Sequence, residues 1–403
     1  YMELSRASDI RAYLQDQRSR MISLLGELVA METPTRRPET QQPILDRLEK
    51  LLDQLGFWTR QIPGKETGGH LFARPEDRTR GNPIQLLLGH CDTVWPVGTL
   101  NGMPLRIAPD KLRGPGSFDM KGGLTQMLFA LRAIGALELE ASVTPVILIN
   151  SDEEIGSPES TRWIRRLANI ADRALVFEPA LGLSGDLKTA RKGGGRFSIR
   201  VTGKSAHAGL EPEAGVSAIL ELSHVVQALH ELNDPDRGIS VNVGTIEGGV
   251  NPNMVASDSE AVVDVRVRRA GDVDEVVDRI RGLTPETPGA ALEITGGMGR
   301  PPMEFTEGNR QLWELAREAG EALELDLDHA AAGGASDGNT TSQFAATLDG
   351  LGAVGDGAHA HHEYVDLDYL VDRTALVALL LTARPLDQSA EVSSLSDKTE
   401  VST

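Results

Sequence analysis

The stretch Leu86-Leu-Leu-Gly-His-Cys-Asp92 decides how the rest of the chain is interpreted. Three consecutive leucines predict a strand that is buried on both faces, which is typical of a parallel sheet. His90 and Asp92 are two residues apart, so on an extended chain their side chains point the same way while Cys91 points oppositely. A histidine and a carboxylate on one side of a strand end resemble half of a metal site. The alternative is a core histidine beside a capping aspartate, and this stretch alone does not separate the two.

The composition indicates an acidic globular protein with two domains. The chain has 403 residues, more than the roughly 250–300 at which a single core stops growing. Its net charge of −19 argues against a nucleic-acid partner, because such binding needs a basic surface. The single cysteine, Cys91, excludes an intrachain disulfide framework and a cysteine-based zinc site.

The sequence also indicates where in the cell the protein is expected. No apolar run reaches about 18 residues, so no membrane span and no membrane partner are expected. The first residues lack the basic and then apolar layout of a signal peptide, which favours the cytoplasm. Tyr1 stands ahead of Met2, so the sequence leaves open a leader that has been removed.

The first part of the chain predicts an α/β fold with a mostly parallel sheet. Strand-like and helix-like patterns alternate up to residue 178 around a central strand at 84–89, as in sheets built from strand–helix–strand units. The expected helices are 8–30, 42–55, 124–134 and 160–167, and the other expected strands are 57–62, 70–73, 143–150 and 174–177.

The pattern changes at residue 191, where polar and apolar residues alternate as in strands with one face in water. We interpret 191–301 as a smaller α+β domain inserted into the first domain, which comprises 1–190 and 302–386. Residues 387–403 are polar and predict a disordered tail. The inserted domain is expected to contain strands at 191–202, 240–246, 261–268 and 292–295 and helices at 215–232 and 273–283; helices at 309–323 and 367–381 then complete the first domain.

Carboxylates follow the ends of several predicted strands, which is where ligands bind in α/β sheets. Asp92, the pair Glu153-Glu154 and Glu178 each come at or after a strand end, Asp119 opens a helix, and a histidine cluster follows at 359–362. Each feature alone has an ordinary explanation, such as a solvated loop or a helix cap. Together they favour a catalytic zinc site, because histidine and carboxylate ligands without cysteine suit Zn²⁺. Two metals that share a carboxylate are a common hydrolytic arrangement.

Five motifs in this order resemble the two-zinc exopeptidase and deacylase family that contains glutamate carboxypeptidase, aminoacylase and succinyl-diaminopimelate desuccinylase. The motifs are Gly-His-Cys-Asp-Thr-Val (89–94), Gly-Ser-Phe-Asp-Met-Lys-Gly-Gly (116–123), Asp-Glu-Glu-Ile-Gly (152–156), Phe-Glu-Pro (177–179) and Ala-His-Ala-Gly (206–209). The chain is most similar to glutamate carboxypeptidase within this family. The resemblance implies a zinc-hydrolase catalytic domain with an inserted dimerisation or lid domain.

The resemblance also implies a ligand set for two Zn²⁺ ions, with Co²⁺ and Mn²⁺ as alternatives. Asp119 bridges the two ions and is followed by a cis peptide bond to Met120. His90 and Glu178 complete one position, and Glu154 with a late histidine completes the other. His359, His361 and His362 crowd together, and the usual family spacing, four residues before Glu-Tyr-Val, selects His359.

Two further residues of the first domain receive catalytic roles from the resemblance. Asp92 orients His90 through the ring nitrogen that does not bind metal. Glu153 is the general base, which takes a proton from the attacking water and later gives it to the leaving amine.

In the inserted domain, the resemblance implies that His207 reaches across a homodimer to stabilise the oxyanion in the partner's site. The resemblance also implies that Asn253 acts in the active site of the partner subunit, in a role similar to that of His207. Arg266 and Arg300 match arginines associated with the substrate's carboxylate, although Arg266 could instead be a solvent-facing sheet residue. Lys188, in the first domain, matches a lysine that pairs with a glutamate side chain, but a two-residue insertion precedes it.

The motifs and the resemblance leave three candidate functions for this protein. The first is a zinc exopeptidase that cleaves the amide to a C-terminal amino acid, and Lys188 favours glutamate. The second is a deacylase of acyl-amino acids, of the acetylornithine or succinyl-diaminopimelate type; Arg266 and Arg300 fit both. The third is an inactive homologue that binds metal or peptide, and the intact Glu153 and ligand set argue against it.

Overall fold

The computed structural model describes residues 4–79 and 81–387, and these fall into two compact units. Unit 1 consists of the described parts of Tyr1–Ala190, Phe305–Ala332 and Ser336–Thr403. Unit 2 consists of Arg191–Glu304 and Gly333–Ala335, so it ends at Glu304 rather than at residue 301 and takes in a short late segment. All but the first residue of the tail expected at 387–403 lies outside the described residues.

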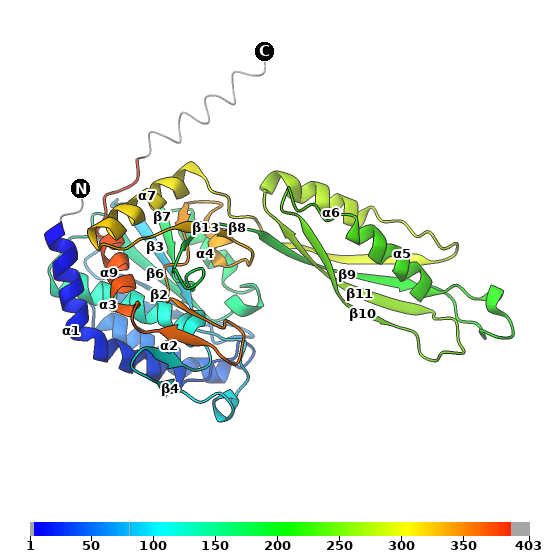
Figure 1. Ribbon diagram of the computed structural model, residues 1–403, viewed down its shortest axis with the longest axis horizontal. Coiled ribbons are helices and arrows are strands. Elements are labelled where there is room, and N and C mark those ends of the chain that lie inside the picture. The colour runs from blue at the N-terminus through cyan, green and yellow to red at the C-terminus, as the bar shows by residue number, and fades with distance from the viewer. Residues whose placement is uncertain (1–3, 80, 388–403) are drawn as a thin grey trace, which may run out of the picture. The chain divides into compact units, whose positions relative to one another are not determined.

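A six-stranded sheet forms the centre of unit 1 (Figure 1). The strands follow the order β1-β2-β6-β3-β7-β14. The pairs β3–β6, β3–β7 and β7–β14 are parallel, whereas β1–β2 and β2–β6 are antiparallel. The predicted α/β class with a mostly parallel sheet is therefore confirmed. The strands are β1 (Phe57–Ile62), β2 (His70–Pro75), β3 (Ile84–His90), β6 (Thr144–Asn150), β7 (Arg173–Val176) and β14 (Ala346–Leu348).

β3 lies in the middle of this sheet and is buried over its whole length. Leu87 belongs to the larger apolar core, whereas Leu86 and Leu88 belong to a second core with Leu148 and Ile164. Alternate side chains therefore enter cores on opposite faces, which explains the unbroken apolar run. The larger core includes residues of α1 (Leu4–Val29), α2 (Pro38–Asp53), α3 (Gly122–Ala136), α7 (Glu307–Ala322) and α9 (Leu370–Leu381), and the second core includes residues of α4 (Thr161–Ala168).

Several short elements of unit 1 were not predicted. Four of them form a sheet in the order β15-β16-β5-β4. These are β4 (Arg106–Ile107), β5 (Lys111–Arg113), β15 (Gly355–Asp356) and β16 (Tyr364–Asp366). The others include β14 at the edge of the central sheet, the pair β8 (Leu187–Arg191) and β13 (His329–Ala332), the short helix α8 (Asp337–Thr341) and 3₁₀ turns at Thr99–Asn101 and Glu153–Ile155. Strands of two to five residues are too short to show a clear periodic pattern. They are extended because they pair with other strands, which their own sequence does not reveal.

Unit 2 is a four-stranded antiparallel sheet with two helices. The strand order is β10-β11-β9-β12, so β10 and β12 are edge strands. Phe197, Ile199 and Val201 of β9 are buried, and the residues between them are not. This alternation is the one expected when one face packs on helices. The elements are β9 (Gly193–Thr202), β10 (Ser240–Gly248), β11 (Asp258–Val267), β12 (Ala291–Arg300), α5 (Ala218–His230) and α6 (Val273–Arg281), with 3₁₀ turns at Pro212–Ala214 and Ala270–Asp272.

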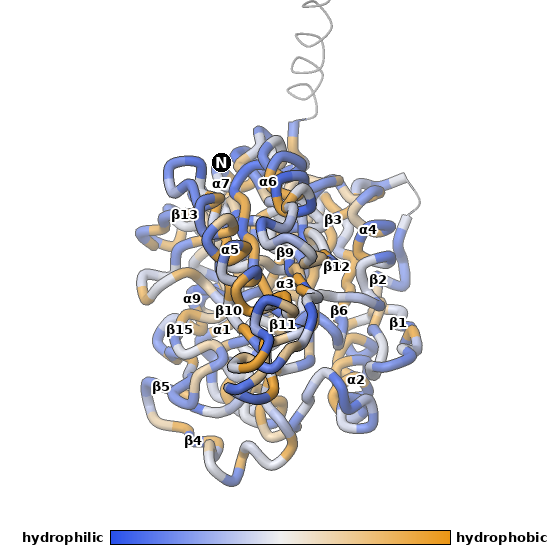
Figure 2. The backbone as a smooth tube through the Cα atoms, turned by 90° about the vertical axis from the view of Figure 1, so that its right-hand side faces the viewer, coloured by the Kyte–Doolittle hydropathy of each residue, from blue (hydrophilic) through white to orange (hydrophobic). Residues whose placement is uncertain are grey.

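Figure 2 colours the backbone by hydropathy, and both hydrophobic and hydrophilic residues occur in each unit. Among the helices that the structure describes, none combines the length and the apolar character needed to cross a bilayer.

Replacing Leu148 with alanine should destabilise unit 1 by about 2–5 kcal/mol, because the truncation leaves a cavity that a packed core cannot fill. Leu148 is fully buried in β6, whereas Leu183 is 59% exposed. Leu183→Ala is therefore the matched control and should change stability by less than about 0.5 kcal/mol. Urea unfolding of the two variants measures the difference, and equal midpoints would contradict the packing described for the sheet.

Candidate metal centre

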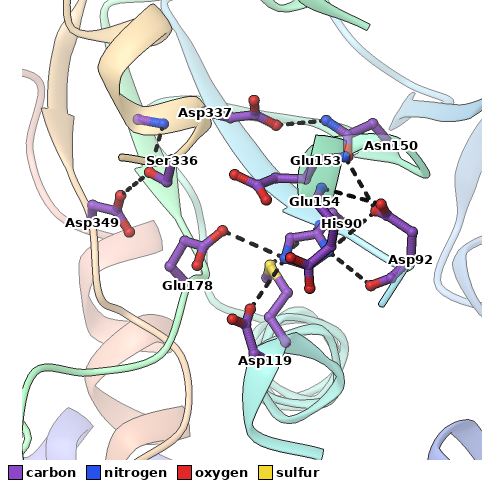
Figure 3. A network of polar contacts seen from close by, with 12 residues as sticks. His90, Asp92, Asp119, Asn150, Glu153, Glu154, Glu178, Ser336, Asp337 and Asp349 are labelled. Atoms are coloured by element: carbon purple, nitrogen blue, oxygen red, sulfur yellow. Dashed lines mark hydrogen bonds and ion pairs between the residues drawn. The ribbon is translucent and has the colours of Figure 1, made fainter. Parts of the chain in front are cut away.

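The carboxyl ends of three neighbouring strands bring the predicted residues together (Figure 3). His90 is the last residue of β3, Glu178 closely follows β7, and Glu153 and Glu154 lie on the 3₁₀ turn that follows β6. Because β3 runs parallel to β6 and β7, these ends meet at one edge of the sheet, as ligand sites in α/β proteins do.

His90, Asp119 and Glu178 form one candidate metal position. His90 Nε2 lies 3.3 Å from Asp119 Oδ1 and 3.5 Å from Glu178 Oε1. One carboxylate oxygen of Glu153 also lies within 4.8 Å of ligand atoms of His90 and Glu178. One imidazole and two carboxylates thus face a common point, with Glu153 beside them.

Asp119, Glu154 and His359 form the second candidate position. His359 Nε2 lies 3.1 Å from Glu154 Oε2 and 3.6 Å from Asp119 Oδ2. The two oxygens of Asp119 therefore face different histidines, which is the geometry of a bridging ligand.

The neighbours of His359 face other groups. The ring of His361 lies 5.3 Å from that of Trp95, and His362 Nε2 lies 3.7 Å from Asp356 Oδ2. His359 is thus the member of the histidine cluster that the fold brings to Asp119 and Glu154, in agreement with the choice made from family spacing.

Asp92 is fully buried and connects both positions. Its Oδ1 lies 3.3 Å from His90 Nδ1, the ring nitrogen that faces away from Asp119. The backbone N–H groups of Glu153 and Glu154 donate to Oδ1 and Oδ2 at 3.3 and 3.2 Å, and Thr35 Oγ1 donates to Oδ2 at 2.7 Å. One carboxylate thus fixes the imidazole and the turn that carries the two glutamates, which is the geometry that the predicted orienting role requires.

The electrostatics of the site favour a bound cation. Burial raises the pKa of Glu154 to about 7, and its hydrogen bond with His359 raises the pKa of that histidine to about 9. Burial opposes the charge of His90, but its hydrogen bonds with Asp119 and Asp92 hold its pKa well above the ordinary value. Glu154 Oε1 is buried without a hydrogen-bond partner among the described residues. A divalent cation would satisfy this oxygen and stabilise the ionised carboxylates.

The turn that carries Asp119 has two further features. The peptide bond between Asp119 and Met120 is cis, as the resemblance implied. The buried carboxylate of Glu363 accepts hydrogen bonds from the backbone of this turn, at Phe118 and Asp119. Glu363 is the first residue of the Glu-Tyr-Val segment that set the spacing of His359, but no role was predicted for its carboxylate, because its acceptor role exists only in the folded chain.

Comparison with known proteins identifies the family. Residues 86–383 match the model of "Peptidase family M20/M25/M40". The chain belongs to this family. It is 30% identical to carboxypeptidase G2 of Pseudomonas sp. (strain RS-16) over 91% of its own length and 89% of that protein's. It is 28% identical to acetylornithine deacetylase of Myxococcus xanthus over 60% and 65% of the two chains.

A solved structure shows the same fold. The M20 family metallo-carboxypeptidase Sso-CP2 from Sulfolobus solfataricus matches with a TM-score of 0.71 and 18% identity, over 90% of this chain and 98% of that one. The family named from the motifs is therefore confirmed, and the protein is a metal-dependent hydrolase of the M20 family.

In unit 2 of this M20 peptidase, the loops of His207 and Asn253 are paired. The backbone N–H of Ala208 donates to Asn253 O at 3.0 Å, and that of Val255 donates to Ala206 O at 2.9 Å. Both His207 and Asn253 are exposed. The fold thus places side by side two residues that the sequence assigned to the same task.

The residues predicted to bind substrate lie in different environments. Arg266 donates to both carboxylate oxygens of Asp264 at 2.8 and 2.9 Å, so part of its guanidinium group is already engaged. Arg300 and Lys188 are buried. The charge of Lys188 acts on Asp119: burial raises the pKa of Asp119, but His90, His359 and Lys188 together hold it below the ordinary value. The substrate-binding roles of these three residues stay predictions.

His359→Ala should remove one of two bound zinc equivalents, because the second position then keeps only carboxylate ligands. His361→Ala and His362→Ala are the matched controls and should retain both equivalents, since their rings face Trp95 and Asp356. Metal analysis after dialysis measures the stoichiometry. Loss of zinc from either control with retention by His359→Ala would reassign the ligand.

Proposed function

We propose that this M20 hydrolase is a two-zinc carboxypeptidase that cleaves the amide bond to a C-terminal amino acid, with glutamate preferred. The observation that carries the proposal is the position of Asp119 between two histidine–carboxylate pairs, with Glu153 beside one of them. The similarity to carboxypeptidase G2 over nine-tenths of the chain supports a carboxypeptidase.

The ligands are those of the two positions already described. His90 and Glu178 would hold one zinc ion, Glu154 and His359 would hold the other, and Asp119 would offer one carboxylate oxygen to each position. When bound, the two ions polarise the scissile carbonyl and make a nucleophile available at neutral pH.

The protein's own groups move the proton. Glu153 takes a proton from the attacking water and delivers it to the leaving amine, as a general base that becomes a general acid. Its backbone N–H is held by Asp92, so the carboxylate that orients His90 also fixes the turn on which the base lies. Adjacent glutamates can therefore have separate tasks: Glu154 faces His359, whereas Glu153 faces the His90 side.

The preference for glutamate rests on Lys188. Its buried ammonium group acts on Asp119, so an anionic side chain near the metals would gain an opposite charge in a poorly solvated place. A deacylase of acyl-amino acids is the second candidate, because acetylornithine deacetylase is among the relatives and because Arg300 would serve any substrate with a free carboxylate.

A panel of acyl-amino acids tests this choice. We expect zinc-loaded enzyme to release glutamate from acyl- and aminoacyl-glutamates faster than it hydrolyses acetylornithine or succinyl-diaminopimelate. Glu153→Ala should lower turnover by roughly 10²–10⁴-fold, because it removes proton transfer by a placed base. The same variant should retain zinc, since its ligands are intact.

The outcomes separate the candidates. Preference for acetylated or succinylated substrates would favour the deacylase. Activity of Glu153→Ala within a few fold of wild type would exclude Glu153 as the base.

We further propose that unit 2 forms a two-fold symmetric homodimer. β10 is an edge strand, and apolar side chains are exposed around it: Ile246 (58%), Val250 (80%), and Ile219 (49%) and Leu220 (51%) at the start of α5. An exposed edge strand flanked by apolar side chains is a site for pairing with another chain. A second copy is the occupant that a self-complementary two-fold interface requires.

His207 is suited to act in such a dimer. The backbone N–H groups of Gly209 and Leu210 both donate to His207 Nδ1 at 3.2 Å. In the neutral ring Nδ1 is then the acceptor, and Nε2 carries the proton. An exposed Nε2–H can donate to a developing oxyanion in the partner's site.

Subunit mixing tests the assignment in trans. His207→Ala and Glu153→Ala homodimers should each be inactive, whereas an equal mixture should regain about a quarter of wild-type activity after random re-association. About half of the dimers are then mixed, and each mixed dimer has one intact site of two. If His207 serves its own chain, every site lacks one group, and no activity returns after verified subunit exchange.

A further inference from the structure

Glu363 is a buried carboxylate outside both proposed metal positions, and its side chain is 1% exposed. Its Oε1 accepts hydrogen bonds from the backbone N–H groups of Phe118 and Asp119 at 3.0 and 3.1 Å. Its Oε2 accepts from the backbone N–H of Gly116 and the indole N–H of Trp95, both at 2.9 Å. Each oxygen thus receives two neutral N–H groups.

These contacts join three segments of unit 1 that carry or follow proposed ligands. Trp95 lies in the loop after β3, close to His90 in the sequence. Gly116, Phe118 and Asp119 belong to the turn that presents the bridging carboxylate. Glu363 ends the loop that begins at His359, and its own N–H donates to Ala360 O at 3.0 Å within that loop. A single carboxylate therefore connects the three segments.

The turn needs such an acceptor. Asp119 and Met120 have non-helical backbone angles (φ −114° and −133°), which interrupts the helical hydrogen bonding of residues 117–121. The N–H groups before this interruption are buried, and a buried N–H without an acceptor costs about 1–3 kcal/mol. An ionised carboxylate satisfies several of them at once, with hydrogen bonds stronger than those of a neutral acceptor.

We propose that Glu363 is a positioning residue of the metal centre: it locks the turn that carries Asp119 to the loop that carries His359, so that the second metal position is formed before metal binds. The inference rests on the proposed two-metal site. Glu363 touches neither metal nor substrate in this role. Its loss should weaken the second position, as loss of groups that orient metal ligands does, by roughly 10–100-fold in affinity.

Glu363→Gln tests the inference with almost no change in volume. Whichever way the amide turns, its NH₂ group faces two N–H donors and cannot accept from them. We expect the weaker of two zinc equivalents to bind about 10–100-fold less tightly. Chelator-stripped protein titrated with zinc against a chromophoric competitor measures both affinities without use of activity.

Glu159→Gln is the matched control. Its carboxylate also accepts from two backbone N–H groups, those of Lys65 and Glu66, and from the Thr67 hydroxyl, but this loop carries none of the proposed ligands. The control should lower the melting temperature of the metal-free protein and leave both zinc affinities unchanged. Zinc affinities in Glu363→Gln that match wild type, or that fall no further than in Glu159→Gln, would overturn the positioning role.

Trp95→Phe is the second variant, which removes one of the four donors and leaves the carboxylate in place. It should weaken zinc binding in the same direction by a smaller factor. If Glu363→Gln does not fold, unchanged zinc affinity in Trp95→Phe overturns the inference. If wild type itself binds fewer than two equivalents, the proposed two-metal site fails, which distinguishes that outcome from failure of the positioning role.

Discussion

Burying several carboxylates at one point is the constraint on which the rest of unit 1 depends. Asp119, Glu154 and Glu178 converge on two histidines in a place where solvent reaches little of them. In a poorly solvated site, like charges at this separation cost free energy unless cations or donors offset them. Burial, and to a smaller extent the charges of Asp119 and Glu153, raises the pKa of Glu154 to about 7. In the metal-free protein the imidazoles of His90 and His359 offset part of this charge, and divalent cations would offset it more completely.

Two further buried carboxylates, those of Asp92 and Glu363, hold the segments that carry the proposed ligands in place. Asp92 and Glu363 are more deeply buried than the carboxylates proposed as ligands, yet both face backbone N–H groups. A carboxylate that accepts from backbone N–H groups fixes the path of the chain, and Asp92 in addition contacts the ring nitrogen of His90 that faces away from Asp119. Because Asp92 lies two residues after His90, and Glu363 four residues after His359, each histidine loop carries the acceptor that anchors a neighbouring turn. The ligand loops thus stabilise one another.

Features that depend on a pattern within one segment of the chain could be predicted from the sequence, whereas features that depend on contacts between distant segments could not. The strand at 84–90 was found because both of its faces are buried, and the long helices because their apolar residues recur at helical spacing. The strands β4, β5, β15 and β16 were missed since two or three residues have no period, and their pairing depends on segments far apart in the chain. The proposed ligands were selected through motifs, and among three crowded histidines it is His359 whose ring lies within 3.6 Å of Asp119 and 3.1 Å of Glu154. The role of Glu363 could not be predicted, although it belongs to the Glu-Tyr-Val segment from which His359 was chosen, because the backbone N–H groups that it accepts from are brought to it only by the fold. The pairing of Arg266 with Asp264 was within reach, since residues two apart on a strand share a face.

The division of the chain into units explains why chemistry is easier to assign here than substrate. The proposed metal ligands and the proposed base all belong to unit 1. Residues proposed to contact substrate are divided: Lys188 belongs to unit 1, whereas His207, Asn253, Arg266 and Arg300 belong to unit 2. Unit 2 can therefore change its loops and exposed side chains without disturbing the metal centre. Relatives that act on different substrates, such as carboxypeptidase G2 and acetylornithine deacetylase, are compatible with this separation. Substrate preference should then depend on residues such as Lys188 and Arg300 more than on the ligand set, which is why 30% identity fixes the family and leaves the substrate to experiment.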